Sequence, residues 1–354
     1  MKNIAFILGT RPEIIKMAPL IKEAYKRGLS PTVINTGQHK ELLYSMWDFF
    51  GIKAHYDLAI MQEGQDLSHT CAKAISSISE VLYHHKPDYV VVQGDTTTTF
   101  AGAMAGYYNG IKVAHIEAGL RTYDLSSPFP EEAHRQMVSK IADLHFCATE
   151  SNKHALIFEN VSTDKIFVVG NPGLDSLRET VLDKLEDDPK KKKHKQILLT
   201  LHRRESFGEP MEKILQAVNY LVEYGGIRVT FPVHPNPNVR EAVSKHLKKC
   251  PEIEIVNPLD YFSFVKAMWD ADVILSDSGG VQEEAPFLGK PTVVLREKTE
   301  RIETLGKSSF LVGADLSKII NITISILSKE ETFKRDFSYG DGYSAPRILD
   351  VLTK

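Results

Sequence analysis

The feature that most limits what this chain can fold into is a regular alternation of short β-branched runs with segments of helical spacing. In the first half, strand-like runs occur at residues 4–8, 32–35, 89–93, 112–116 and 144–148. The segments between them place apolar residues at i, i+3 and i+4, most clearly after Pro12, a residue suited to a first helical turn. Strands that alternate with helices predict an α/β fold with a parallel, doubly wound sheet and helices on both faces.

The same alternation resumes after a pause near residues 167–195. The pause contains the end of a strand in FVVGNPGLDS, a helix to about Leu185, and the run DDPKKKKHK, which is typical of a solvated loop because neighbouring acids offset its charge. Strand-like runs then follow at 197–201, 228–233, 254–256, 273–276 and 292–295. Two α/β domains of similar size are therefore expected, with bounds 1–169 and 170–342.

Composition excludes several classes of protein. At 354 residues, with 42% hydrophobic and 25% charged residues, the chain is typical of a soluble globular protein large enough for two domains. A formal net charge of −3 gives no electrostatic case for nucleic acid or an anionic membrane. Cys71, Cys147 and Cys250 show no C-x-x-C spacing, which indicates reduced thiols in a cytoplasmic protein and no metal site. The apolar start is too short for a signal peptide, and no apolar run approaches the roughly 18 residues of a membrane span.

A strand, a glycine pair and a helix follow one another in VILSDSGGVQEE, residues 273–284. The first four residues are those of a buried strand, Gly279 and Gly280 break it, and helical spacing follows. Amides at such a helix start lack intrahelical acceptors and carry roughly half a positive charge, which suits phosphate. Glu284 can accept two hydroxyl hydrogen bonds from a ribose diol. The alternative is a structural turn in which Ser278 caps the helix and Glu284 is solvated.

The first strand-to-helix turn is GTRPEIIK, residues 9–16. It lacks the G-x-G-x-x-G of dinucleotide sites, and no G-x-x-x-x-G-K-[ST] occurs in the chain, so neither a nicotinamide cofactor nor ATP is expected. Arg11 and Lys16 place two cations near a helix N-terminus, where the dipole disfavours them unless an anion lies close by. A binding role for at least one is favoured over the alternative that both face solvent.

Two acids follow strands that should be neighbours. Asp95 ends YVVVQGD, and Glu117 follows KVAHI. Because ligands of open α/β sheets bind outside the carboxyl ends of the strands, the two carboxylates can share one site and act as acid and base on one substrate. Asp95 can alternatively cap a helix that begins within residues 96–99, whereas Glu117 has no obvious capping role.

Further candidates lie in PFPEEAHR and LHRRESFG. Glu131 and Glu132 follow a proline at a helix start, where acids are favoured for structural reasons alone. His202 and Arg203 directly follow a strand of the second half, and a histidine with guanidinium donors suits a diphosphate leaving group. By itself, a histidine at such a place is more often structural.

With these pieces assembled, the sequence resembles the UDP-N-acetylglucosamine 2-epimerase family. The motifs that carry the resemblance are GTRPEIIK, GDTTTT, HIEAGLRT, PFPEEAHR, LHRRESFG, HPNPNVRE, SDSGGVQEEAP, GKPTVVLREKTER and YGDGYSAPRI, in order from residue 9 to 348. The resemblance implies a glycosyltransferase-B-like fold, in which two Rossmann-like domains flank a central cleft. It also implies that the last helix, about 343–354, packs back on the first domain.

The resemblance also implies roles for individual residues and no cofactor. In the second domain, the diphosphate contacts would be Ser278, Gly279 and Gly280, the ribose contact Glu284, the uracil-side contact Phe264, and a further nucleotide contact Arg301. Around the sugar and diphosphate lie Arg11, Lys16, Asp95, Glu117, Glu131 and His202. The family usually has Asn where this chain has His134. Some members use a second substrate molecule as activator through a region resembling Gln38-His39, but Glu41 and Gly64 depart from the residues of strongly regulated members.

The expected reaction is inversion at C2 of UDP-N-acetylglucosamine to give UDP-N-acetylmannosamine. No ketone acidifies the C2 proton, so elimination of UDP, with proton removal by a carboxylate, offers a route through the family's 2-acetamidoglucal intermediate. Asp95 and Glu131 are the expected pair at C2, with Glu117 also handling protons and His202 holding the diphosphate.

Several alternatives stay open at this point. One is a relative that hydrolyses the intermediate and releases N-acetylmannosamine, and another is an enzyme acting on a UDP-diacetamido-uronic acid. Glycosyltransferases of the same fold and catalytically silent sugar-nucleotide sensors are less favoured. The family further implies a homodimer and a place in polysaccharide biosynthesis.

Overall fold

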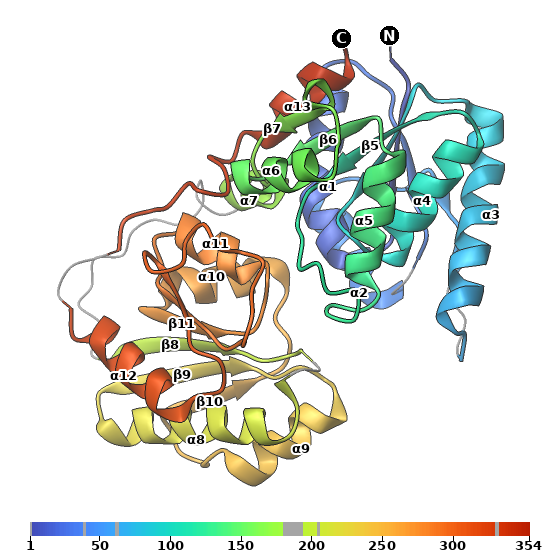
Figure 1. Cartoon of the computed structure of the whole chain (residues 1–354). Helices are drawn as coiled ribbons and strands as arrows, with labels where there is room; N and C mark the ends of the chain where they lie inside the picture. Colours follow the sequence, from blue (N-terminus) through green and yellow to red (C-terminus); the bar gives the residue numbers. More distant parts are fainter. Residues whose placement is uncertain (1, 38–39, 61–63, 180–193, 204–205, 330–332) are drawn as a thin grey trace. The chain divides into compact units, whose positions relative to one another are not determined.

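The computed structural model describes residues 2–37, 40–60, 64–179, 194–203, 206–329 and 333–354. The chain divides into two compact units (Figure 1). The first contains Met1–Ser176 and Gly340–Lys354, and the second contains Leu177–Tyr339. The first unit therefore continues seven residues beyond the expected boundary at 169, and the chain returns to it at residue 340.

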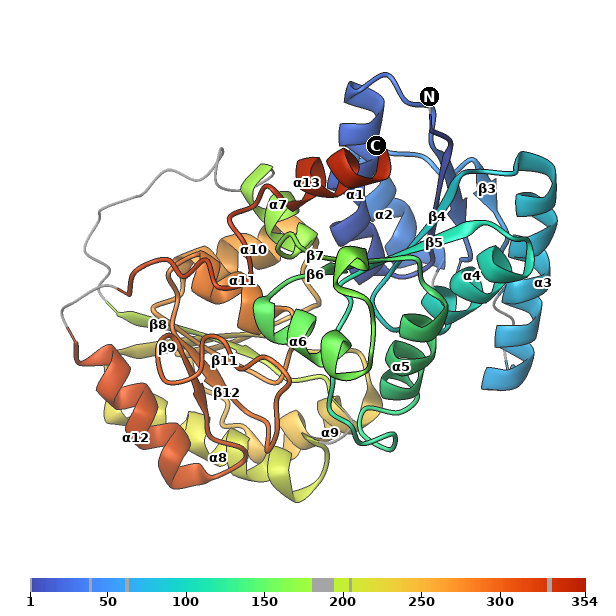
Figure 2. The ribbon, with the colours of Figure 1, turned by 45° about the horizontal axis from the view of Figure 1, so that its top comes forward.

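The first unit is built on one parallel sheet with the strand order β3-β2-β1-β4-β5-β6-β7. Its strands are β1 (Ile4–Leu8), β2 (Thr32–Asn35), β3 (Tyr56–Asp57), β4 (Tyr89–Gln93), β5 (Lys112–Ile116), β6 (Leu144–Cys147) and β7 (Ile166–Val168). Its helices are α1 (Arg11–Lys26), α2 (Lys40–Phe50), α3 (Leu67–His85), α4 (Thr97–Tyr108), α5 (Glu131–Ile141), α6 (Glu150–Phe158), α7 (Pro172–Leu177) and α13 (Ser344–Leu352). Helices α3, α4 and α5 lie side by side, and α1 contacts both α2 and α13 (Figure 2).

Helix α1 shows how the local sequence sets an element. Thr10 caps it by accepting a hydrogen bond from the amide of Glu13, whose side chain accepts one from the Thr10 amide in return. Pro12 lies in the first turn, where its missing N–H has no intrahelical acceptor to lose. The apolar residues on one face of the helix, among them Ile14, Met17 and Ile21, are fully buried.

The second unit repeats the plan with the strand order β10-β9-β8-β11-β12-β13. Its strands are β8 (Lys195–Thr200), β9 (Ile227–Pro232), β10 (Ile253–Val256), β11 (Val273–Ser276), β12 (Thr292–Val294) and β13 (Ser309–Leu311). Its helices are α8 (Glu209–Tyr224), α9 (Pro237–His246), α10 (Tyr261–Asp270), α11 (Val281–Phe287) and α12 (Leu316–Leu327). All pairings between these strands are parallel, so the expected fold class, α/β with two Rossmann-like domains, is confirmed.

Each sheet has one point at which the strand order reverses. In the first unit β1, β2 and β3 run outward in one direction, and β4 then lies on the other side of β1. In the second unit β8, β9 and β10 do the same, and β11 lies on the other side of β8. Open α/β sheets bind ligands at such switch points, outside the carboxyl ends of the strands. The fold therefore directs attention to the turns that follow β1 and β4 and those that follow β8 and β11.

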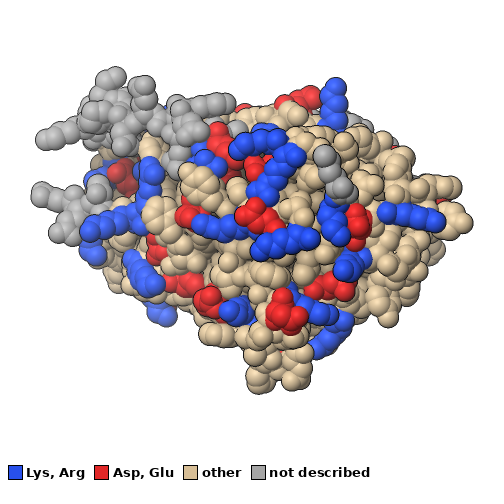
Figure 3. Space-filling model, turned by 90° about the horizontal axis from the view of Figure 1, so that it is seen from above, with Lys and Arg blue, Asp and Glu red and all other residues tan. Residues whose placement is uncertain are grey.

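The structure adds two short strands that the sequence did not predict, β3 and β13. Helix α7 ends at Leu177, while residues 180–185 of the helix expected to reach Leu185 lie outside the described residues, as does the lysine run at 190–193. No helix among the described residues combines the length and apolar character needed to cross a membrane. On the face drawn in Figure 3, basic and acidic side chains are interspersed.

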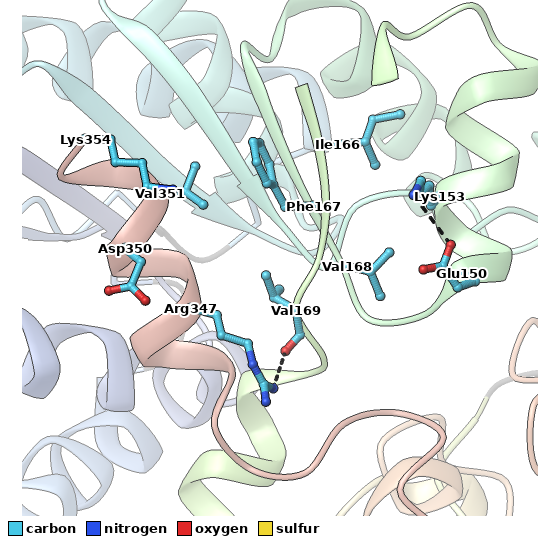
Figure 4. Close-up of a pocket in the computed structure, with 10 residues that line it drawn as sticks. All are labelled: Glu150, Lys153, Ile166, Phe167, Val168, Val169, Arg347, Asp350, Val351 and Lys354. Atoms are coloured by element: carbon cyan, nitrogen blue, oxygen red, sulfur yellow. Dashed lines mark hydrogen bonds and ion pairs between the residues drawn. The ribbon is translucent and has the colours of Figure 1, made fainter. Parts of the chain in front are cut away.

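The C-terminal helix α13 packs on α1 of the first unit. Arg27, the C-cap residue of α1, pairs with Asp350 at 2.7 Å and donates to the carbonyl of Pro346. Arg347 of α13 donates to the carbonyl of Val169, next to the edge strand β7 (Figure 4). A shallow pocket there, between α6, β7 and α13, contains none of the predicted site residues.

Candidate active site

The turn after β1 is fixed by a buried carboxylate. Glu13 accepts hydrogen bonds from the amides of Gly9 (2.8 Å) and Thr10 (2.7 Å) and, across the switch point, from the hydroxyl of Thr96 (2.5 Å). Burial raises the pKa of Glu13, although these hydrogen bonds act in the opposite direction. Because Thr96 belongs to the turn after β4, Glu13 ties together the two turns that flank the switch point.

Glu117 and Lys16 form a buried pair at the same edge of the sheet. Lys16 Nζ lies 2.5 Å from Glu117 Oε2, and the side-chain amide of Gln93 donates to the same oxygen. The anion near this helix N-terminus is thus a carboxylate of the chain itself. Glu117 also has a left-handed backbone, φ 62°, which is unfavourable for a residue other than glycine. Such strain is common at functional sites, where the surrounding structure holds it in place.

Asp95 is not the cap of α4. Thr96 takes that role by accepting from the amide of Thr99. Asp95 instead accepts hydrogen bonds from Arg135 of α5, with Nε at 2.8 Å and Nη2 at 2.7 Å from Oδ2. Its side chain keeps 26% of its surface exposed, so a carboxylate oxygen can still meet a substrate.

The two neighbouring acids of α5 have different surroundings. Glu132 is fully buried and accepts from the amides of Thr122 and Tyr123, which makes it structural. Glu131, the first residue of α5, is half-buried. It lies four residues before Arg135, so both belong to one face of the helix, and Arg135 contacts Asp95. Glu131 is therefore the more accessible of the two acids, whereas Glu132 is held by two backbone amides.

Two histidines hold the turn that contains Asp95 through hydrogen bonds to its backbone carbonyls. His134 donates from Nδ1 to the carbonyl of Asp95 (2.9 Å) and stacks on Phe100. His115 of β5 donates from Nε2 to the carbonyl of Gly94 (2.7 Å). Burial lowers the pKa of His115 to about 4, so it is neutral at physiological pH.

In the second unit, the turns after β8 and β11 meet at Asp277. This carboxylate is fully buried and accepts from the amides of His202 and Arg203 at 3.0 Å each, and from the hydroxyl of Ser206 at 3.0 Å. The imidazole Nδ1 of His202 lies 2.9 Å from Asp277 Oδ1. His202 and Arg203 thus stand at the switch point of this sheet, directly beside the glycine turn.

The glycine turn itself is not capped by Ser278, whose amide instead donates to Ser276. Helix α11 begins after Gly280, with no side-chain cap. In the described part of the chain, the amides of Gly279, Gly280 and Val281 have no hydrogen-bond acceptor. The turn therefore offers a row of unsatisfied donors, as phosphate recognition requires.

The two glycines meet different surroundings. A β-carbon on Gly279 would lie 2.9 Å from the guanidinium carbon of Arg301, so the arginine behind the turn requires glycine there. A β-carbon on Gly280 would meet nothing within 4 Å, and its φ of −61° suits any residue. Among the described residues, no contact therefore explains why position 280 is glycine, and the space beside it is open.

Arg301 is buried in an acidic setting. Its Nε donates to Glu283 (2.8 Å) and its Nη1 to Glu300 (2.5 Å), so it is braced by two carboxylates. Phe264 of α10 and Glu284 of α11 are both half-buried, which leaves part of each side chain accessible. Arg204, which shares a motif with His202, lies outside the described residues, as does Gln38-His39.

Sequence reasoning missed three residues that hold this site together: Glu13, Arg135 and Asp277. A signal existed for Glu13, because Thr10 and Glu13 have the spacing of a capping box. Nothing in the local sequence marks Arg135 or Asp277, since their partners are 40 and 75 residues away.

Comparisons with known proteins place these residues in a defined context. The family model described as UDP-N-acetylglucosamine 2-epimerase matches residues 22–353. The UDP-N-acetylglucosamine 2-epimerase of Bacillus subtilis strain 168 is 44% identical over 365 residues, which cover 99% of this chain and 94% of that protein.

Solved structures give the same result. The S. aureus MnaA–UDP co-structure is 41% identical, with a TM-score of 0.92, and the match covers 100% of this chain and 96% of that one. The UDP-GlcNAc 2-epimerase from Neisseria meningitidis bound to UDP-GlcNAc is 39% identical, with a TM-score of 0.89 and complete coverage of both chains. These likenesses confirm the expected glycosyltransferase-B-like fold class.

Proposed function

Because the chain belongs to the UDP-N-acetylglucosamine 2-epimerase family, we propose that it interconverts UDP-N-acetylglucosamine and UDP-N-acetylmannosamine by elimination and re-addition of UDP. The observation that carries this proposal is the group of acids at the switch point of the first unit. Asp95 and Glu117 follow neighbouring strands, and each carboxylate is held by a cation, Arg135 or Lys16. Related proteins that bind UDP or UDP-GlcNAc support the choice of substrate.

The chemistry requires one group to remove the C2 proton and another to return a proton to the opposite face of the sugar. We assign these roles to Asp95 and Glu131. Asp95 contacts Arg135, Glu131 lies four residues before Arg135 in the same helix, and both acids keep part of their surface accessible. General acid and base groups of this kind typically contribute about a hundred- to ten-thousandfold each. Glu117, which is buried and paired with Lys16, is assigned to proton transfer near the anomeric oxygen.

Expulsion of UDP requires donors for the charge that develops on its diphosphate. We assign this task to the unsatisfied amides of the glycine turn, with Ser278, His202 and Arg203 beside them, and to Arg11. Glu284 would bind the ribose, Phe264 would pack against the uracil, and Arg301 would support the nucleotide from behind Gly279.

The test is incubation with UDP-N-acetylglucosamine in deuterated water, followed by NMR of the products. The proposal expects UDP-N-acetylmannosamine with deuterium at C2, because the removed proton exchanges with solvent before re-addition. Free N-acetylmannosamine and UDP would instead identify a hydrolysing enzyme. UDP-sugar binding with neither product would contradict catalysis on this substrate, and turnover only of a UDP-diacetamido-uronic acid would correct its identity.

Homodimer formation and a cytoplasmic location complete the proposal. The exposed apolar side chains Tyr83, Tyr107, Tyr108 and Met137, on the adjacent helices α3, α4 and α5, support a face suited to self-association. Three cysteines, none of them in a disulfide, suit a reducing compartment. Sedimentation of the purified protein tests the assembly: a monomer at micromolar concentration would contradict it.

A further inference from the structure

The carboxylate of Asp277 has an unusual environment, because it combines full burial with direct contact to an exposed histidine. None of the Asp277 side chain is exposed, whereas 42% of the His202 side chain is. Asp277 Oδ2 accepts from the backbone amides of His202 and Arg203, and Oδ1 lies 2.9 Å from His202 Nδ1. The His202 amide also lies 3.2 Å from Oδ1, so both oxygens contact His202, and Oδ1 is the one that meets its imidazole.

The protonation of His202 follows from this arrangement. An ionised carboxylate can only accept hydrogen bonds, so the proton between Asp277 and His202 must be on Nδ1. Burial alone would raise the pKa of Asp277, but the hydrogen bond and charge of His202 and the neighbouring amides outweigh it and hold that pKa below its ordinary value. The Asp277 carboxylate is therefore charged at neutral pH, and His202 turns Nε2 outward.

We propose that Asp277 is a positioning residue that fixes the orientation and tautomer of His202, with Nδ1–H held by Asp277 and Nε2 as the nitrogen that takes up a proton when it meets the diphosphate of the substrate. The diphosphate as ligand rests on the proposed function, whereas the tautomer does not. Asp277 directly precedes Ser278 and the glycine turn, so the residue that orients the imidazole also begins the turn with the unsatisfied amides. An imidazole that carries a proton on both nitrogens donates from Nδ1 to the carboxylate and from Nε2 to a diphosphate oxygen.

A purely structural role for Asp277 would be to connect β8 to β11. Asp272 provides a comparison, because it connects the same two strands without contacting a histidine side chain. Asp272, at the opposite end of β11, accepts from the amide of Gln196 at 2.7 Å. The two strands also pair over four residues, from Val273–Ile197 to Ser276–Thr200. The contact with an imidazole is what distinguishes Asp277 from this structural counterpart.

The nearby His234 does not take the place of His202. Its Nδ1 accepts from the amide of Asn236, so its proton is on Nε2, and burial lowers its pKa. Its ring centre lies 6.3 Å from that of His202. His234 is therefore neutral with its proton on Nε2, whereas His202 carries its proton on Nδ1.

The first experiment reads the tautomer of His202 in the full-length protein by ¹⁵N–¹H NMR, with the resonance assigned from its loss in His202→Ala. The proposal expects Nδ1–H in the wild type at a pH where the ring is neutral. In Asp277→Asn, the amide oxygen can keep the backbone N–H groups while its NH₂ faces Nδ1, which expels the proton to Nε2. An Nε2–H tautomer in the wild type, or no change in Asp277→Asn, would overturn the proposal.

The second experiment measures UDP affinity by calorimetry. Asp277→Asn is expected to weaken binding about tenfold to a hundredfold, because a charged hydrogen-bond partner is lost. Asp272→Asn, the matched control, should bind as the wild type does. In the His202→Ala background Asp277→Asn should cause no further loss, whereas additive losses would show that Asp277 acts independently of His202 and overturn the proposal.

The two experiments separate this inference from the proposed function. A wild type that binds no UDP would contradict the assigned substrate, and the tautomer measurement would still decide the role of Asp277. Binding of UDP by a wild type with the wrong tautomer would leave the substrate standing and remove Asp277 from its positioning role.

Discussion

Two residues of the proposed site are of a type that packing among the described residues does not explain. Gly280 is the clearer of the two. Glycine is needed at 279 because the guanidinium of Arg301 fills the place of a side chain, but no atom of the described residues fills the corresponding place at 280. Glu117 is a second case, because its left-handed backbone costs free energy that glycine would avoid. Both residues belong to the proposed site.

For the glycine turn we expect Gly280→Ala to fold normally and to bind UDP poorly. Alanine suits the backbone at this position and should leave stability unchanged or raise it by about 0.4–1 kcal/mol, while its methyl group enters the space assigned to the diphosphate. Thermal unfolding and calorimetry with UDP check the two parts. Gly279→Ala is the contrasting variant, since its methyl group would press on Arg301 and lower stability. Wild-type UDP affinity in Gly280→Ala would argue against this turn as the diphosphate site.

We expect that Asp95→Asn keeps the fold. The rate at which the C2 proton exchanges with solvent should fall by about a hundred- to ten-thousandfold. The amide oxygen can still accept from Arg135, which also contacts Glu132, so no buried charge is left without a partner. The measurement is deuterium incorporation into UDP-N-acetylglucosamine. Asp143→Asn is the control, because Asp143 binds the amide of Val113 at the opposite end of β5. Exchange at the wild-type rate would remove Asp95 from the proton transfer.

At the scale of elements, the sequence predicts the long strands well because each is a continuous apolar run bounded by turns. Strands β3 and β13 escaped prediction because two or three residues carry no periodicity, and their place at the sheet edges depends on pairing with a neighbour. The sequence also predicts that β4 and β5 are adjacent, which the structure confirms. It gives no sign that α5 delivers Arg135 to Asp95, because that contact depends on how the helix packs on the sheet.

The buried His115 of strand β5 makes the stability of the folded protein depend on pH. Its pKa in the folded protein is about 4, against an ordinary value of 6.5, so the unfolded chain binds a proton first as the pH falls. Stability linked to His115 is therefore fully present above pH 6.5 and lost between 6.5 and about 4, by about 3 kcal/mol. His115→Gln keeps a donor for Gly94 and should lack this loss. Denaturant unfolding of both proteins at several pH values is the measurement, and parallel pH curves would contradict it.

At the scale of the whole molecule, the chain leaves the first unit at Ser176 and returns to it at Gly340. The returning helix α13 buries Ile348 and Leu349, and its start is fixed by Asp175, which accepts from the amide of Ala345 at 2.8 Å. The first unit, which carries the proposed acids, is thus completed only by the last residues of the sequence.

We therefore expect Leu349→Ala to destabilise the first unit by about 2 to 5 kcal/mol, the usual cost of a large cavity in a core. Hydrogen exchange should accelerate in β1 and α1 and stay slow in β8 and β9. Val351→Ala is the matched control, because Val351 is only half-buried and its truncation should cost less. Equal acceleration in both units would contradict the assignment of α13 to the first unit alone.

The sequence by itself determined the α/β class, the two α/β halves and the family, and it supplied the candidate site residues, because apolar periodicity and short motifs are local properties. Only the tertiary structure decided which carboxylates are structural and which remain accessible, since that depends on partners far along the chain. Glu131 and Glu132 are neighbours in sequence, yet one is buried on two backbone amides and the other is half-buried at the helix start. Asp277 lies beside His202 because β8 and β11, which precede these two residues, pair with each other in the sheet.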